Sequence, residues 1–151
     1  MVDVTSLKPH PTTGLRININ KPHMSIENLP YKNVVLIGLQ QNQLPESLIL
    51  NLAKNGNQNF FIYGSDANKI EDYIDDILID NNLFCTTSAN DELDECILLF
   101  SNEFYQYGEG ALANSSHLII YDEKYTDIAI IFKNLKKYNL FTSISKGQEQ
   151  S

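Results

Sequence analysis

The sequence predicts an α/β fold: a compact three-layer domain with a mainly parallel sheet of four or five strands and helices on both faces. Short, continuously apolar segments alternate along the chain with segments whose apolar residues recur every three or four positions. The first pattern is typical of strands buried on both faces, and the second of amphipathic helices. Because strands and helices alternate, parallel strands joined by crossover helices are expected. A length of 151 residues is that of one domain.

The expected strands are short apolar runs bounded by turn residues. Gly38 ends the first run, and Gly64 with Ser65 forms the turn after the second. The runs that we interpret as strands cover residues 34–37, 60–63, 83–87, 118–121 and 140–144.

Helices are expected between these strands. Pro45 fits a first helical turn, and Gly56 can end that helix. The clearest helical spacing follows Ser65 or Asp66, either of which can cap it. Ser88 with Asp91 three residues later resembles a capping signal for a further helix. The apolar positions that define the four helices are Leu48, Ile49 and Leu52; Ile70, Tyr73, Ile74, Ile77 and Leu78; Leu93, Cys96, Ile97 and Phe100; and Ile128, Ile131, Phe132 and Leu135, within a helix expected at 125–138.

Residues 1–32 differ from the rest because they hold four of the five prolines. We interpret them as an irregular N-terminal arm, in which alternating apolar residues at 15–19 indicate a short edge strand. Residues 33–146 then form the single α/β domain, and residues 147–151 are a tail.

Cysteine content and hydropathy indicate a reducing compartment. Cys85 and Cys96 are the only cysteines, and both lie in apolar surroundings, so no disulfide is expected. The N-terminus lacks the pattern of a signal peptide, and no apolar stretch approaches the length needed to cross a bilayer. We therefore expect a cytoplasmic protein without a membrane contact.

Turns at the carboxyl ends of the expected strands are the default position for a ligand in such a sheet. The turns at Gly38 and Gly64 match neither the dinucleotide fingerprint nor the Walker loop. Three acids that could hold magnesium there, Asp66, Asp122 and Glu123, are also ordinary caps and turn formers. No histidine or serine falls in a recognised catalytic pattern. We expect no catalytic residue, no cofactor and no metal.

Acidic residues are concentrated in one stretch. From Asp66 to Glu109, twelve carboxylates accompany a single cation, Lys69, which gives this stretch a net charge of −11, against −8 for the whole chain. Like charges four residues apart destabilise a helix by about 0.2–0.5 kcal/mol per pair. A solvated face, or acids that complement a helix dipole, would tolerate interspersed lysines. Their near absence favours a surface whose negative potential serves a partner.

Such a surface suits a basic protein, whereas nucleic acid requires cationic groups, and this chain has one arginine. We predict that two neighbouring helices present the carboxylates side by side, with tyrosines of the following loop as anchors. The predicted partner-binding residues are Asp72, Asp75, Asp76, Asp80, Asp91, Glu92, Asp94, Glu95, Tyr105 and Tyr107.

In size, acidity and lack of catalytic motifs, the chain is similar to bacterial immunity proteins and antitoxins that block nuclease toxins. This resemblance is one of composition and implies that the carboxylates occlude the cationic surface with which a toxin grips phosphate. Two alternatives remain open from the sequence. One is a small α/β enzyme or nucleotide-binding domain that uses the Gly38 and Gly64 turns, and the other is an assembly subunit that docks through the N-terminal arm.

Overall fold

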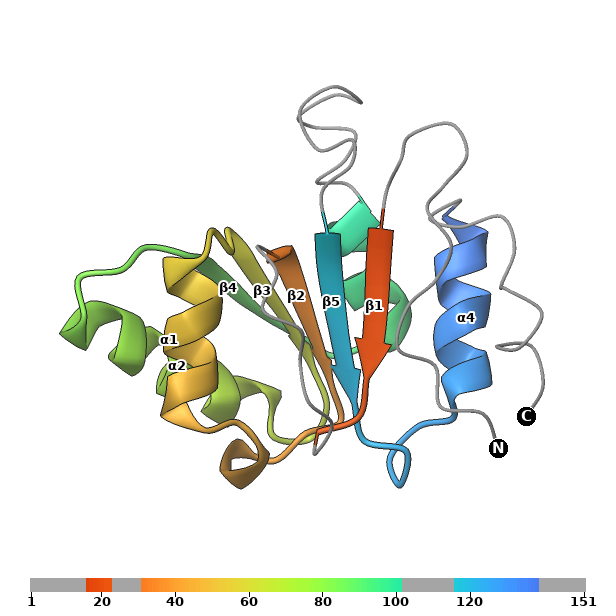
Figure 1. Cartoon of the computed structure of the whole chain (residues 1–151). Helices are drawn as coiled ribbons and strands as arrows, with labels where there is room; N and C mark the ends of the chain where they lie inside the picture. The colour runs from red at the N-terminus through yellow and green to blue at the C-terminus, as the bar shows by residue number, and fades with distance from the viewer. Residues whose placement is uncertain (1–15, 23–30, 102–115, 139–151) are drawn as a thin grey trace.

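A five-stranded, all-parallel sheet forms the centre of the molecule (Figure 1). The computed structural model describes residues 16–22, 31–101 and 116–138. The strand order is β1-β5-β2-β3-β4. The strands are β1 (Arg16–Asn20), β2 (Tyr31–Ile37), β3 (Asn59–Tyr63), β4 (Thr86–Asn90) and β5 (Ser116–Tyr121).

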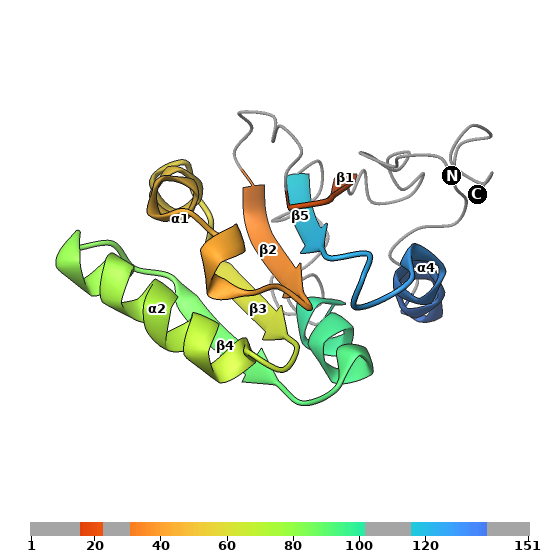
Figure 2. The same cartoon turned by 90° about the horizontal axis from the view of Figure 1, so that it is seen from below.

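Helices cover both faces of this sheet, as the sequence predicts (Figure 2). On one face lie the short helix η1 (Gln41–Gln43), α1 (Glu46–Lys54) and α2 (Ala67–Asp80). On the other lie a helix at residues 93–101 and α4 (Ile128–Lys137). Alternate residues of the central strands enter the two resulting apolar cores, which accounts for the continuous apolar runs in the sequence.

The order of the strands creates a reversal point between β2 and β5. The chain runs outward from β2 to β3 and β4, then returns to place β5 on the other side of β2. After β2 it enters the layer of α1, and after β5 it enters the layer of α4. In doubly wound sheets a ligand crevice commonly opens at such a point, beyond the carboxyl ends of the strands.

Strand β1 lies at one edge of the sheet, parallel to β5. It falls within the segment that we interpreted as an arm, at the place where alternation indicated an edge strand. Ile17 and Ile19 are buried in the core beside helix 93–101 and α4. The remainder of the proline-containing segment and the strand expected at 140–144 lie outside the described residues.

Strand β4 occupies the opposite edge and corrects the sequence prediction. The strand expected at 83–87 begins three residues later, and Ser88 lies inside it rather than capping a helix. The apolar residues that suggested the earlier start have other roles. Leu83 closes the end of α2 through its N–H bond to Leu78, and Cys85 donates from its thiol to the carbonyl of Asn57.

The ends of the helices also differ in detail from the prediction. Pro45 is the N-cap residue of α1 rather than part of its first turn. Asp66 occupies the N-cap position of α2 without a side-chain capping bond. The last helix begins at Ile128, because the side chain of Asp127 accepts a hydrogen bond from Ala129 N–H and so defines the start.

A row of polar side chains crosses the sheet near its amino-terminal end. Thr86, Asn59, Asn33 and His117 are neighbours in register on β4, β3, β2 and β5. The Thr86 hydroxyl donates to Asn59 Oδ1, and Asn59 Nδ2 donates to Asn33 Oδ1 at 2.7 Å. Asn33 Nδ2 lies 3.3 Å from His117 Nδ1. An amide nitrogen can only donate, so Nδ1 accepts and the imidazole proton lies on Nε2.

This row fixes the register of four strands, because a slip of one residue would leave buried amides without partners.

No helix of the described segments combines the length and apolarity needed to span a bilayer.

Candidate protein-binding surface

The reversal point between β2 and β5 is the first place to look for a ligand site. Gly38 follows β2 with a φ of +67°, and Asp122 follows β5. The aromatic ring of Tyr125 lies directly over Gly38 and packs edge-on against Tyr63, with ring centroids 6.0 Å apart. Gln43 Nε2 donates to Asp122 Oδ2 at 3.0 Å and so joins the two sides. Tyr125 and the Gln43–Asp122 bond therefore occupy the centre of the crevice, and a depression of about 570 Å³ stays open beside Tyr125, lined by residues 121 and 123–128.

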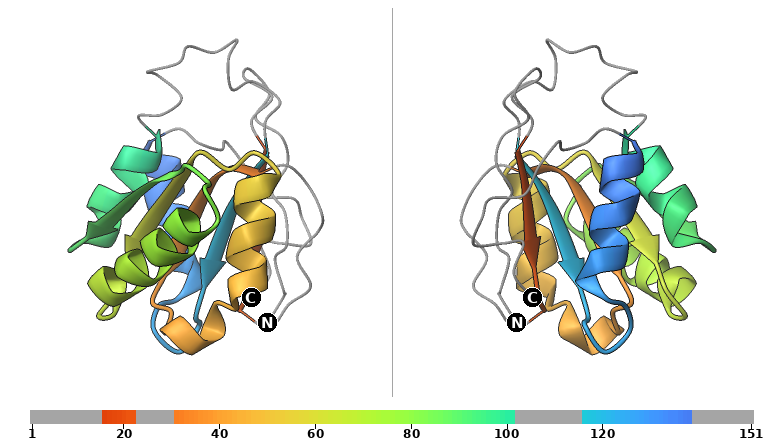
Figure 3. Two further views of the ribbon diagram at one scale, coloured as in Figure 1. Left: turned by 90° about the vertical axis from the view of Figure 1, so that its left-hand side faces the viewer. Right: turned by 90° about the vertical axis from the view of Figure 1, so that its right-hand side faces the viewer.

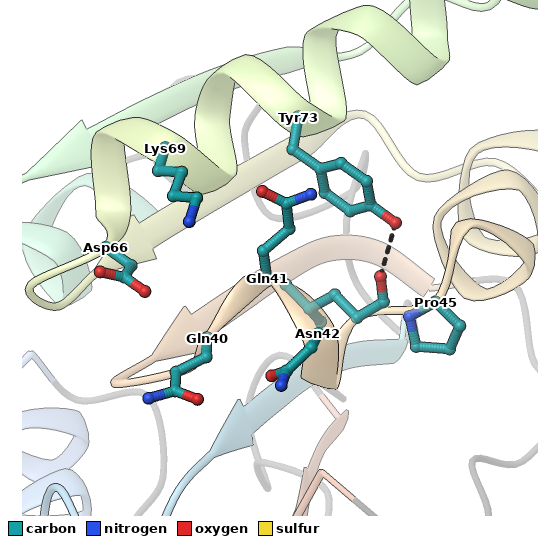
Figure 4. A pocket seen from close by; sticks show the side chains of 8 residues that line it. Gln40, Gln41, Asn42, Pro45, Asp66, Lys69 and Tyr73 are labelled. Carbon is teal, nitrogen blue, oxygen red and sulfur yellow. Dashed lines mark hydrogen bonds between the residues drawn. The ribbon is translucent and has the colours of Figure 1, made fainter.

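A depression of about 560 Å³ lies beside this point, between η1 and the start of α2 (Figure 4). Gln40, Gln41 and Asn42 line it from one side, and Asp66 and Lys69 from the other. The Tyr73 hydroxyl donates to the carbonyl of Leu44 at 2.8 Å and closes one end. The depression is shallow, and among the described residues that line it Lys69 is the one cationic side chain.

The three acids considered as magnesium ligands do not converge. Asp66 lines the depression in Figure 4, whereas Asp122 accepts hydrogen bonds from Gln43 and from the backbone of Lys124. Glu123 forms an ion pair with Lys21 at 3.0 Å. Within residues 16–22, 31–101 and 116–138, no three histidine, cysteine, aspartate or glutamate side chains are grouped as a metal would require.

The acids of α2 divide into two rows. Glu71 and Asp75 face the edge strand β4, where Asp75 accepts from the Thr87 hydroxyl at 2.7 Å and Glu71 accepts from Ala89 N–H. Partial burial, helped by the negative charges of Asp75 and Asp72, raises the pKa of Glu71. These two acids lie over the outer edge of the sheet, and charged groups there protect β4 from pairing with a strand of another chain.

The second row of α2 acids faces solvent. Asp72, Asp76 and Asp80 are exposed, and α2 contributes to neither of the ion pairs formed among the described residues. Their spacing of four residues places them along one side of the helix. Their negative charge therefore faces solvent.

The four acids between positions 91 and 95 belong to the opposite face of the sheet. Asp91, Glu92 and Glu95 are exposed at the start of helix 93–101. Asp94 instead accepts from Lys137 Nζ at 3.0 Å and from the Tyr138 hydroxyl at 2.8 Å, and these bonds lower its pKa. Asp94 thus links helix 93–101 to the end of α4 through Lys137.

The expectation of one unbroken acidic layer is therefore wrong in its geometry. Strand β4 lies between α2 and helix 93–101, so the two acidic groups flank it from opposite faces of the sheet (Figure 3). The structure brings together Asp72, Asp76 and Asp80 as one exposed group, and Asp91, Glu92 and Glu95 as another. Asp75 and Asp94 are engaged within the protein, and Tyr105 and Tyr107 lie outside the described residues.

Two exposed apolar residues were missed by the sequence reasoning. Ile79, in the last turn of α2, is 71% exposed, and Phe84, four residues beyond the end of this helix, is 89% exposed. Phe84 was assigned to a buried strand because of its apolar neighbours. The position of Ile79 off the apolar stripe of α2 was the one available signal.

Searches against protein-family models, curated proteins and solved structures found no match to this chain.

Proposed function

We propose that this protein is an acidic binding protein that neutralises a basic protein, as an immunity protein or antitoxin does when it occludes the cationic surface of a bacterial toxin, here a nuclease. The observation that supports this proposal is the exposed carboxylate row Asp72, Asp76 and Asp80 on α2, which forms no ion pair with a lysine of the described segments. A negative surface of this kind accelerates association with a cationic partner and makes it sensitive to salt.

The charge balance favours a protein partner. The chain has a net charge of −8 and a single arginine, so its surface repels phosphate rather than neutralising it. A nuclease active surface carries the opposite charge, because it must hold phosphate groups. Carboxylates placed over that surface would exclude the nucleic acid substrate by charge and by volume.

The enzyme alternative receives less support from the geometry. It needs an open pocket between the Gly38 and Gly64 turns, where groups with perturbed pKa values could converge. Tyr125 covers Gly38, and Gly64 lies against the backbone of Gly38 itself. The depression beside these turns is shallow, and Asp66 and Lys69 are the charged groups that the described residues bring to it.

The proposal is tested with the protein encoded next to this chain. That neighbouring protein is expressed in a bacterial host with and without this chain, and growth is recorded. We expect the neighbouring protein to arrest growth and the chain to restore it. The double reversal Asp72→Lys/Asp76→Lys should abolish protection and weaken association, measured by surface plasmon resonance at low salt.

A matched control separates the specific surface from total charge. Glu46→Lys/Glu123→Lys changes two exposed acids elsewhere and brings the net charge from −8 to the same −4. Because this change also removes the Glu123–Lys21 ion pair, circular dichroism first verifies that the control is folded. This control should still protect. Equal protection by both double variants would contradict the proposal, and so would a toxic neighbour that the unaltered chain fails to neutralise.

A further inference from the structure

Two large apolar side chains at the end of α2 are more exposed than any other in the described residues. Phe84 and Ile79 are 89% and 71% exposed, whereas Ile130, Tyr125 and Leu98 are at most 48% exposed. Only four residues separate Phe84 from Ile79 in the sequence. Single exposed apolar residues are ordinary, but two that lie so close in the sequence, beside the end of one helix, form a candidate contact surface.

The backbone around Phe84 is held on both sides. Asn82 adopts a φ of 55°, which lets its N–H bond to Ile79 and lets Leu83 N–H bond to Leu78, as in a Schellman motif. Leu83 packs against the core, and β4 starts two residues after Phe84. The exposed ring is thus attached to a fixed turn, so little backbone freedom would be lost on binding.

Carboxylates lie beside Ile79 on the exposed side of α2. Ile79 follows Asp76 by three residues and Asp72 by seven, a spacing that places all three on the outward side of α2. Asp80 is exposed on the last residue of the helix. An apolar centre with a charged border is the usual arrangement of an interaction hot spot.

We propose that Asp76, Ile79, Asp80 and Phe84, here called the Phe84 patch, are the docking point for a basic protein surface that carries an apolar recess. This inference rests on the proposed function and specifies the contact that holds the partner. Phe84 and Ile79 enter the recess, and the carboxylates face lysine or arginine side chains at its border.

A second copy of this chain fits the patch less well. A symmetric contact through Phe84 would bring the Asp76 and Asp80 carboxylates of the two copies close together. Like charges in such an interface oppose association, whereas a cationic border on the partner is attracted. Charge complementarity therefore selects a basic protein.

Two synthetic peptides of equal length and equal lysine content test the patch without the natural partner. One peptide carries leucine between its lysines, and the other carries serine. Binding is measured by isothermal titration calorimetry, and the bound position by shifts of the backbone amide signals in NMR spectra. We expect the leucine peptide to bind about tenfold more tightly than the serine peptide, with shifts centred on residues 76–84.

Two variants then test whether the difference in affinity between the two peptides arises from the Phe84 patch. Phe84→Ser/Ile79→Ser should remove most of it, whereas Ile130→Ser, at a 48% exposed isoleucine of α4, should leave it intact. Both variants alter exposed side chains, and thermal unfolding followed by circular dichroism verifies that they remain folded. The proposal is overturned if the two peptides bind equally, if the difference survives in the double variant, or if the amide shifts lie elsewhere.

Sedimentation equilibrium of the protein alone tests whether a second copy of the chain occupies the Phe84 patch. The protein should be monomeric, and self-association abolished by Phe84→Ser would assign the patch to a second copy and overturn the proposal. The peptide measurements and the growth assay fail independently. Peptide binding at the patch without growth protection would refute the neutralising function only, and protection without selective peptide binding would refute the docking point only.

Discussion

The ring of Tyr125 lies so close to Gly38 that a Cβ atom at position 38 would come within 2.4 Å of its ring carbons. Real Cβ contacts are essentially never this short. Gly38 is therefore needed for the packing of the protein itself, at the point where a doubly wound sheet commonly holds a ligand. The same glycine that suggested a binding turn in the sequence makes room for an aromatic side chain at the centre of the crevice.

Substituting this glycine should destabilise the protein strongly. Gly38→Ala places an L side chain at a φ of +67° and against Tyr125, so we expect a loss of about 2 kcal/mol or more in unfolding free energy. Gly56→Ala is the control, because its φ is +110° but its Cβ would meet only Lys32 Nζ, at 3.6 Å. Urea unfolding should show the larger loss at position 38, and equal losses would argue against the steric role of Tyr125.

The turn after α2 offers a stabilising substitution. Asn82→Gly relieves the left-handed conformation of residue 82 and should raise the unfolding free energy by about 0.5–1 kcal/mol. The neighbouring change Asn81→Gly should lower it, because Asn81 has a negative φ and its Nδ2 donates to Ile77 at 2.8 Å. Chemical denaturation of the two variants compares them directly, and a stabilised Asn81→Gly would contradict this account of the helix end.

His117 should make stability depend on pH in the mildly acidic range. Burial, together with the charge of Lys32, lowers the pKa of His117 from 6.5 to about 3. The unfolded chain therefore takes up a proton below pH 6.5 that the folded protein refuses, so stability falls as the pH falls. The slope from this residue is at most about 1.4 kcal/mol per pH unit.

The variant His117→Gln isolates this contribution, because it keeps an acceptor for Asn33 and does not titrate. Denaturation curves recorded between pH 7 and pH 4 should show a smaller acid loss in the variant than in the unaltered protein. Parallel pH profiles would mean that His117 is not responsible.

Glu71 and Asp75, which both face β4, should repel each other at neutral pH. The pKa of Glu71 is raised, so the folded protein holds its proton more tightly than the unfolded chain, and the stability it contributes is lost as the pH rises through the folded pKa. Glu71→Gln removes the i,i+4 repulsion with Asp75 and should stabilise by roughly 0.2–0.5 kcal/mol at pH 7. The gain should vanish below pH 4 and shrink in high salt, as thermal unfolding at several salt concentrations would reveal.

The edge strands mark the limit of prediction from the sequence. Buried central strands such as β2 and β5 were predicted near their observed positions, because burial on both faces requires a continuous apolar run. β4 has a neighbour on one side only and consists of polar and small residues, so no such run marks it. Leu83 and Phe84 were predicted to begin a strand because the sequence alone does not distinguish an apolar residue in a helix cap, or at an exposed corner, from one in a sheet.

The candidate surface follows the same division. The sequence by itself determined that carboxylates gather on two helices almost without lysines, because this depends only on composition and helical spacing. The tertiary structure alone decided that β4 separates these helices, that Asp75 and Asp94 are used internally, and that Phe84 is exposed. These outcomes depend on crossovers and on contacts between residues distant in the chain, such as Asp94 with Lys137. Local periodicity carries no information about them.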